Sequence, residues 1–155
     1  MSSKWCFRAT SNRQDSPSEA VVVHCSDHRF QQGFREFLVE GLGLGSYALL
    51  AIPGGGHFCS MEQLQPKFAK AGLQSLRFLV KRTGARRIIL IGHDDCLFFK
   101  DQLQFFFTEA DLNQRQITNL KRARRIVQES FARATVELFF ADTGLDGSLQ
   151  FRNIG

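Results

Sequence analysis

Four short apolar runs, separated by segments with helical spacing, constrain the fold of this chain more than any other feature. The runs fall at 20–25, 47–52, 87–92 and 135–141, and each is dominated by aliphatic or aromatic residues. Continuous apolar strands that alternate with helices are typical of a parallel sheet buried on both faces. The sequence therefore predicts an α/β fold with a central, mostly parallel four-stranded sheet flanked by helices.

The segments between these runs predict the helices and one further strand. Apolar side chains at helical spacing predict helices at 31–40, from residue 60 to residue 84, after residue 96 and at 111–131. Ser60 is expected to begin the long helix because Ser60 and Gln63 have capping-box spacing, although Pro66 could divide that helix in two. The 149–151 segment could add a short fifth strand.

Length and composition place the chain among ordinary globular proteins. It has 155 residues, of which 43% are hydrophobic and 23% are charged, and this is long enough for one core. Residues 1–19 are expected to form a polar lead-in, and residues 20–155 a single α/β domain. No apolar run approaches the ~20 residues of a membrane span, and residues 1–19 lack the apolar stretch of a signal peptide. We expect a cytoplasmic protein with no membrane partner.

The charge balance does not argue for a nucleic-acid partner. The formal net charge is +5, from 20 Lys and Arg and 15 Asp and Glu, and such a mild excess supplies only non-specific attraction. The basic run at 121–125 lies in a predicted helix whose apolar residues leave Arg122 and Arg125 facing outward. We interpret the run as a solvated helix face.

The phenylalanine content points to a subunit interface. The chain has 16 Phe against one Trp and one Tyr. Phe98, Phe99 and residues 105–107 cover more than one face of their predicted helix, whereas a core needs only one stripe. We therefore expect part of this helix to lie in the interface of a homodimer or a higher homo-oligomer.

Two of the apolar runs end at, or are followed by, residues of types that commonly bind metals. Cys25 ends the first run, and His93 and Cys96 follow the third. If the first and third strands are neighbours, these residues meet at the carboxyl edge of the sheet, where sites form in open α/β sheets. Thiolate and imidazole ligands suit zinc, and three protein ligands leave the fourth position open for water. Cys25 and Cys96 could instead be buried apolar thiols.

Asp27 and Arg29 lie immediately after the first of these cysteines. Asp27 could accept a hydrogen bond from a water on the metal, or it could bind the zinc itself and close the site. Arg29 could hold Asp27 away by pairing with it. The two residues could also be a plain structural ion pair.

Together these residues resemble the β-class carbonic anhydrases. Cys25-Ser26-Asp27-His28-Arg29 and His93-Asp94-Asp95-Cys96 match that family's Cys-x-Asp-x-Arg and His-x-x-Cys motifs. The similarity extends over roughly residues 20–151. The resemblance implies Zn²⁺ on Cys25, His93 and Cys96 with an Asp27–Arg29 dyad beside it. It also implies reversible hydration of carbon dioxide to bicarbonate by zinc-bound hydroxide, in a dimer or a multiple of dimers.

Several alternatives remain open around this interpretation. His28 and His57 are candidate proton shuttles, although an exposed loop histidine is the commoner outcome for His57. The three glycines at 54–56 suggest a flexible turn at the rim of the pocket. The substrate could be a linear sulfur analogue, carbonyl sulfide or carbon disulfide, or the protein could be a catalytically silent zinc-binding protein with Asp27 as its fourth ligand.

Overall fold

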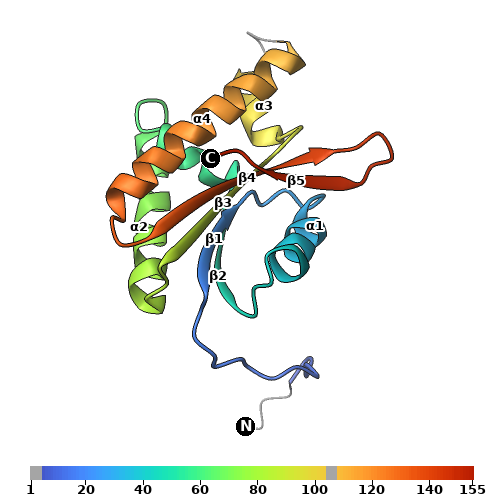
Figure 1. Ribbon diagram of the computed structural model, residues 1–155, viewed down its shortest axis with the longest axis vertical. Helices are drawn as coiled ribbons and strands as arrows, with labels where there is room; N and C mark the ends of the chain where they lie inside the picture. Colours follow the sequence, from blue (N-terminus) through green and yellow to red (C-terminus); the bar gives the residue numbers. More distant parts are fainter. Residues whose placement is uncertain (1–4, 104–107) are drawn as a thin grey trace.

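The computed structural model describes residues 5–103 and 108–155 of the chain. Its strands are β1 (Ala20–His24), β2 (Tyr47–Ala51), β3 (Arg87–His93), β4 (Thr135–Thr143) and β5 (Leu149–Asn153). Its helices are α1 (Gln31–Glu36), α2 (Pro66–Thr83), α3 (Leu97–Leu103) and α4 (Glu109–Ser130). A π-helical turn (Phe37–Gly41) continues α1, and a 3₁₀ helix (Gly55–Ser60) precedes α2. Figure 1 shows these elements arranged around one sheet.

The strands form a sheet in the order β2-β1-β3-β4-β5 within the described residues. β1 to β4 run parallel, and β5 returns antiparallel to β4. The predicted four-stranded parallel sheet is therefore confirmed, and the fifth strand at its edge is present. β1 and β3 are neighbours, with His24 opposite Ile91 in the parallel register. This pairing brings the carboxyl ends of the first and third strands together.

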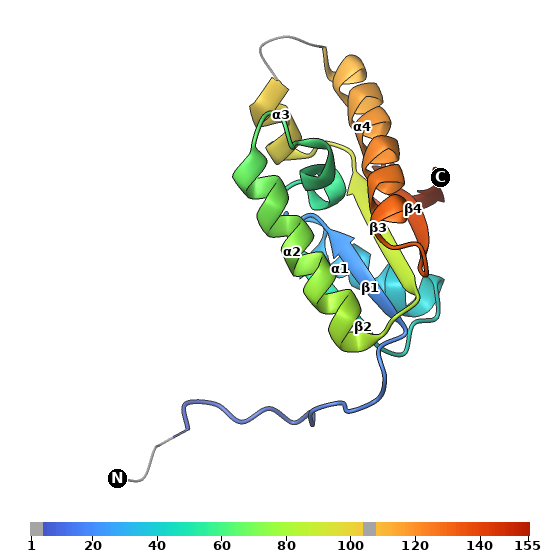
Figure 2. The same ribbon diagram turned by 90° about the vertical axis from the view of Figure 1, so that its left-hand side faces the viewer.

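Different helices cover the two faces of the sheet because successive side chains of a strand point to opposite faces. Val23 packs in one cluster with Leu76 of α2 and Leu120 of α4, whereas Val22 packs in another with Phe34 of α1. All five side chains are fully buried, and burial of each contributes about 1.5–3 kcal/mol to folding. Figure 2 shows α2 and α4 on the near side of the sheet and α1 behind it.

The long helix begins later than its capping pattern indicates. α2 starts at Pro66, which occupies its first turn, whereas Ser60 ends the preceding 3₁₀ helix. The Ser60 hydroxyl donates to the carbonyl of His57 and caps no helix. Proline fits the first turn of a helix because it lacks an N–H and its φ is already helical. The expected start at Ser60 is therefore wrong, whereas the expected end at Gly84 is confirmed by its left-handed φ of 65°.

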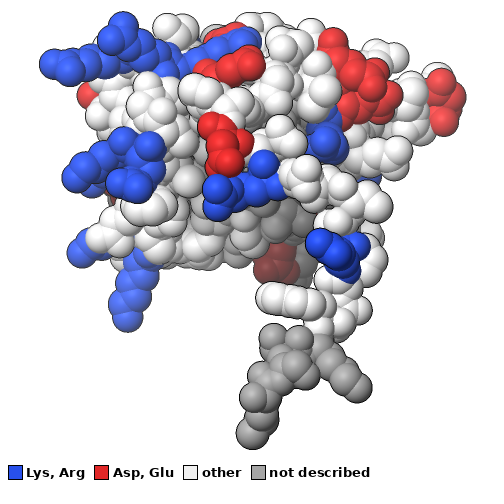
Figure 3. Space-filling model, turned by 90° about the horizontal axis from the view of Figure 1, so that it is seen from below, with Lys and Arg blue, Asp and Glu red and all other residues white. Residues whose placement is uncertain are grey.

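The charged surface agrees with the interpretation of the basic run. Arg122 and Arg125 of α4 are exposed, so they lie on the solvated face of that helix. Figure 3 shows Lys and Arg side chains gathered on the side of the molecule where α2 and α4 lie in Figure 1. Among the described helices, none is long and apolar enough to cross a membrane.

Candidate metal centre

The three predicted ligands meet at the carboxyl ends of β1 and β3. Cys25 follows β1 directly, His93 is the last residue of β3, and Cys96 precedes α3. One ligand atom from each lies within 4.8 Å of the others, and all three residues are buried. The parallel pairing of β1 with β3 produces this cluster, because it places the ends of both strands at one edge. Sequence reasoning and the structure agree on the cluster.

His93 is oriented with one ring nitrogen free to bind a metal. Its Nδ1 lies 2.6 Å from the backbone carbonyl oxygen of Asp94, which can only accept, so Nδ1 carries the proton. The other nitrogen, Nε2, is buried and has no hydrogen-bond partner. Phe30 packs against the ring with centroids 4.0 Å apart, and Gln116 donates to the His93 carbonyl at 2.7 Å. A buried acceptor without a partner is costly unless it binds a ligand, so Nε2 fits a metal.

The two thiols are unequal in acidity. A hydrogen bond from Cys96 and contacts with His93 and the Asp27 backbone lower the pKa of Cys25 to about 4, although burial opposes this. The same hydrogen bond and burial raise the pKa of Cys96. A backbone N–H of Gly54 also donates to Cys25 Sγ at 3.3 Å. The Gly54 N–H favours a thiolate at Cys25, and metal binding would release the proton that the two thiols share.

The glycines after β2 press the backbone against this thiolate. Gly54 and Gly55 have φ values of +78° and +58°, a backbone conformation that residues other than glycine rarely adopt. A Cβ on Gly55 would lie 3.1 Å from both the Cys25 nitrogen and the Ile91 oxygen. The segment is buried and begins the 3₁₀ helix. The interpretation as a flexible turn at the pocket rim is therefore wrong, because close backbone packing requires these glycines.

Asp27 and Arg29 form a tight pair beside the cluster. Arg29 Nη2 lies 2.7 Å from Asp27 Oδ2, and Arg29 Nε lies 3.0 Å from Oδ1. The Asp27 side chain is only 6% exposed. Hydrogen bonds from Arg29 lower the pKa of Asp27 to about 2. The carboxylate is thus ionised at neutral pH and held on the guanidinium.

A small cavity opens beside Cys25 and Asp27. It has a volume of about 230 Å³ and is lined by Cys25, Ser26, Asp27, His28, Pro53, Leu97 and Phe98. The wall is apolar at Pro53, Leu97 and Phe98 and polar at the Asp27 side. A larger cavity of about 560 Å³ lies between α1 and the β4–β5 turn, but none of the three cluster residues lines it. The smaller cavity is the one that belongs to the cluster.

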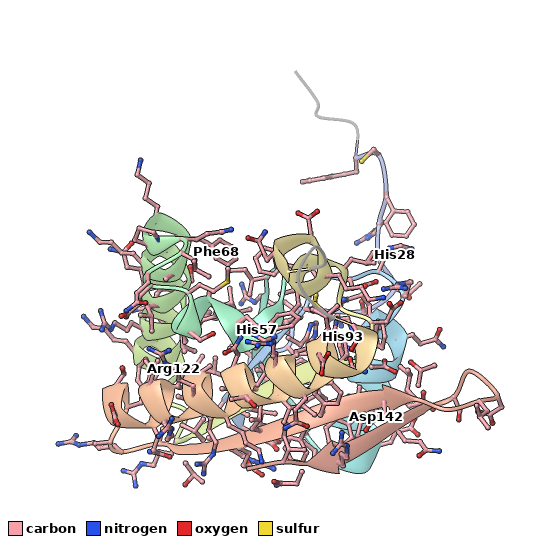
Figure 4. All side chains as sticks on the ribbon, turned by 90° about the horizontal axis from the view of Figure 1, so that it is seen from above. His28, His57, Phe68, His93, Arg122 and Asp142 are labelled. Atoms are coloured by element: carbon pink, nitrogen blue, oxygen red, sulfur yellow. The ribbon has the colours of Figure 1, made fainter. Side chains whose placement is uncertain are left out.

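The two candidate shuttles differ in position. His28 is exposed and lines the small cavity. His57 is only 1% exposed and stacks on Phe99 of α3 at a centroid distance of 4.9 Å. Figure 4 shows His57 and His93 in the interior and His28 toward the periphery. The expected exposed loop histidine at 57 is therefore wrong. Burial lowers the pKa of His57 to about 3, so the His57 ring would be neutral near neutral pH.

The Phe-rich helix after Cys96 contributes to this region. Phe99 is buried in a cluster with Cys25, Cys96 and Leu112, and Phe98 packs against it. Leu97 is the exposed apolar side chain here, at 55%. The remaining phenylalanines of the expected interface, residues 105–107, lie outside the described residues. The expectation that this helix joins two subunits stays a prediction.

Comparison with known proteins supports the fold. No family model matches the chain, and no curated protein matches its sequence. Isoform I of the β-carbonic anhydrase of Trichomonas vaginalis has a TM-score of 0.55 at 16% identity, over 92% of this chain and 87% of its own. The β-carbonic anhydrase CafD of Aspergillus fumigatus has a TM-score of 0.56 at 12% identity, over 96% and 95%.

Further structures agree. One of two tetrameric β-carbonic anhydrases from Sordaria macrospora has a TM-score of 0.54 at 12% identity, over 90% of this chain and 81% of its own. The chain therefore has the β-carbonic anhydrase fold. The resemblance seen in the two motifs is confirmed at the level of the fold across almost the whole chain.

Proposed function

We propose that the chain binds zinc on Cys25, His93 and Cys96 and catalyses the reversible hydration of carbon dioxide to bicarbonate. The observation that carries this proposal is the buried Cys-His-Cys cluster, with ligand atoms within 4.8 Å of one another. The cluster lies beside an arginine-held carboxylate and faces a small cavity. The β-carbonic anhydrase fold supports the same assignment.

The donor set fits zinc. Two sulfur ligands and one imidazole nitrogen are typical of zinc sites, and a catalytic site keeps its fourth position open. When bound, zinc lowers the pKa of a coordinated water and so supplies a nucleophile near neutral pH. Two thiolates and a neutral imidazole would cancel the charge of the ion, which favours a nearby cation, and Arg29 supplies one.

Asp27 would act as a hydrogen-bond acceptor in the cavity. With its pKa lowered to about 2 by Arg29, the carboxylate is ionised and can only accept. The Arg29 backbone N–H and Nε fill both acceptor positions of Oδ1. Oδ2 accepts from Nη2 at 2.7 Å and has only a longer 3.3 Å contact with Nε, so Oδ2 is the oxygen that would accept from a donor in the cavity. The pairing also holds Asp27 away from the thiolates. Arg29 thereby keeps a position open that Asp27 would otherwise fill.

Proton release would run through His28 rather than His57. His28 lines the cavity and is exposed to solvent, so it connects the cavity to bulk water. His57 is buried, and its pKa of about 3 does not suit a shuttle. We therefore assign the possible shuttle role to His28.

The apolar wall of the cavity also favours a second substrate class. Pro53, Leu97 and Phe98 line one side of it, and an uncharged linear sulfur compound would gain more from such a wall than carbon dioxide. Carbonyl sulfide and carbon disulfide are thus alternative substrates for the same residues. Competition between carbon dioxide and carbonyl sulfide in one assay would separate the two assignments.

Assembly from several copies is part of the proposal. The β-carbonic anhydrases of Sordaria macrospora with this fold are tetrameric. We propose a homodimer or a higher homo-oligomer for this chain. Light scattering at micromolar concentration tests this, and a monomer there would contradict it.

Stopped-flow carbon dioxide hydration tests the activity. Zinc-loaded protein should exceed the buffer rate clearly between pH 7 and 9, whereas Cys25→Ala should lose zinc and turnover together. Cys59→Ala is the matched control, because Cys59 is an equally buried cysteine that packs in a separate cluster. Zinc-loaded protein without turnover across this range would refute carbon dioxide hydration and leave the sulfur analogues to be assayed.

A further inference from the structure

Arg29 binds a second aspartate besides Asp27. Its Nη1 donates to Asp95 Oδ2 at 2.8 Å, and its Nη2 donates to the Asp95 backbone carbonyl at 3.0 Å. Asp95 lies between His93 and Cys96, 66 residues along the chain from Arg29. One guanidinium thus joins the two segments that supply the cluster.

We propose that Asp95 is a positioning residue that holds Arg29 in the orientation that pairs with Asp27, so that the Asp27 carboxylate stays off the metal. This inference rests on the proposed zinc centre. It adds that the open state of the centre depends on a residue of the second motif. Sequence reasoning assigned no role to Asp95.

The donors of the guanidinium support this role. Arginine has five N–H donors in a fixed planar fork. Nε and Nη2 bind Asp27, while Nη1 and Nη2 bind Asp95. Two adjacent edges of the guanidinium, which share Nη2, are therefore occupied by different aspartates. Arg29 cannot turn to release Asp27 without also breaking its bonds to Asp95.

Asp27 depends on Arg29 for its position. The hydrogen bonds to its carboxylate come from the Arg29 side chain and the Arg29 backbone N–H. A carboxylate held by one residue moves when that residue moves. Loosening Arg29 would therefore free Asp27 to turn toward the neighbouring thiolates, where a cation would attract it.

The backbone of Asp95 is shaped for this contact. Its φ is +51°, and it is the only residue other than glycine with a positive φ in the described ranges. Glycine adopts this conformation freely, and aspartate and asparagine adopt it more readily than other residues with side chains. Aspartate at this position thus combines the left-handed backbone with a carboxylate. The conformation also lets the backbone carbonyl and the carboxylate of Asp95 bind the same guanidinium.

The neighbours of Asp95 hold it in place. Lys100 of α3 binds its other carboxylate oxygen. The preceding residue, Asp94, binds both the backbone N–H and the hydroxyl of Thr143, at 2.9 and 2.8 Å. These bonds tie the segment between His93 and Cys96 to α3 and β4. Asp95 is therefore a fixed anchor for Arg29 rather than a mobile rim residue.

Exposure makes the proposal testable without disturbing the fold. The Asp95 side chain is 45% exposed, against 6% for Asp27. Replacing an exposed carboxylate changes stability little, and exposed ion pairs contribute little on their own. A change at the metal on replacing Asp95 would therefore report its action through Arg29.

The experiment uses cobalt-substituted protein and azide. Cobalt(II) reports its own ligands through visible absorption, and azide binds only where a coordination position is open. Asp95→Asn and Asp95→Gly both tolerate a positive φ and both weaken the hold on Arg29. Each should raise the apparent azide Kd by about two- to fivefold, the effect of losing an exposed charge pair. Asp142→Asn is the matched control, since Asp142 is a 40% exposed aspartate paired with Arg152 away from the cavity.

A second arm assigns the effect to Asp27. In an Asp27→Asn background the carboxylate that closes the site is gone, so Asp95→Asn should no longer change azide binding. The proposal is overturned if both Asp95 variants match Asp142→Asn, or if their effect persists in the Asp27→Asn background. Failure of the wild-type chain to take up cobalt with sulfur ligation would instead refute the metal centre, and the role of Asp95 with it.

Discussion

The backbone N–H of Gly54 donates a hydrogen bond to Cys25 Sγ at a donor–acceptor distance of 3.3 Å. This contact exists because the glycine segment after β2 runs against the end of β1 without side chains between them. Hydrogen bonds to a thiolate favour its ionised form. The loop therefore prepares Cys25 to bind a cation, although it contributes no ligand itself.

Replacement of Gly55 should weaken the metal site. In Gly55→Ala the new Cβ would meet the Cys25 nitrogen and the Ile91 oxygen at 3.1 Å, both of which are backbone atoms. We expect a loss of about 1–3 kcal/mol in the free energy of unfolding and a higher Kd for zinc. Competition with a chelator measures the Kd.

Gly43→Ala separates this effect from the strain of the backbone alone. Gly43 also has a positive φ, of 67°, but a Cβ there would meet nothing within 4 Å. The Gly43→Ala variant should therefore be less stable than the wild type but have the same Kd for zinc. Equal zinc affinity in both variants would show that the glycine segment does not shape the site.

Removal of zinc should lower the melting temperature. Ligand that binds only the folded state stabilises it by about 4 kcal/mol at a thousandfold excess over Kd. Zinc would also give His93 Nε2 the partner it lacks among the protein atoms. Thermal unfolding with zinc and with a chelator measures the difference. Cys25→Ala should lack it, and a zinc-dependent shift that survives in Cys25→Ala would place the ion elsewhere.

Asp27→Asn should separate metal binding from turnover. Asn retains the size of Asp27 but loses the charge that Arg29 holds, and it is a weaker acceptor in the cavity. We expect zinc content to stay near that of the wild type and kcat for carbon dioxide hydration to fall by about 10²-fold. Metal analysis and stopped-flow kinetics on the same sample check both halves. Full turnover in Asp27→Asn would restrict the pair to a structural role.

His57 should make the stability of the protein depend on pH. Its folded pKa of about 3 lies below the ordinary 6.5, so the unfolded chain binds the proton more readily. The stability due to neutral burial is full above pH 6.5 and is lost as pH falls toward 3, by about 1.4 kcal/mol per pH unit.

His57→Phe removes this titration and fills the same space against Phe99. Chemical unfolding at pH 7 and at pH 5 should show a smaller loss of stability in the variant than in the wild type, by about 2 kcal/mol. Equal losses would mean that His57 is not held neutral by burial.

Local sequence pattern predicted the sheet and the meeting of the two cysteines with His93 well, because both depend on short segments. Each apolar run matches a strand to within two residues. Cys25, His93 and Cys96 meet because they follow two strands that are neighbours. Once the order of the strands is known, the positions of these three residues in the sequence are enough to predict that they lie together.

The errors arose where distant parts of the chain decide the outcome. His57 is buried because its 3₁₀ helix packs against α4 and α2 and because Phe99 of α3 stacks on its ring, which no spacing around residue 57 reveals. The capping pattern predicted a helix start at Ser60, but α2 starts at Pro66, because proline geometry suits the first turn of a helix better. Asp95 was overlooked because its contact with Arg29 depends on a left-handed backbone.

X-ray absorption at the zinc edge of the zinc-loaded protein tests the central claim most directly. The account predicts two sulfur ligands at about 2.3 Å and nitrogen or oxygen ligands at about 2.0 Å, with no zinc retained by Cys25→Ala after the same loading and both sulfur ligands kept in Cys59→Ala. A wild-type spectrum without sulfur, or one unchanged in Cys25→Ala, would contradict a zinc centre on Cys25, His93 and Cys96.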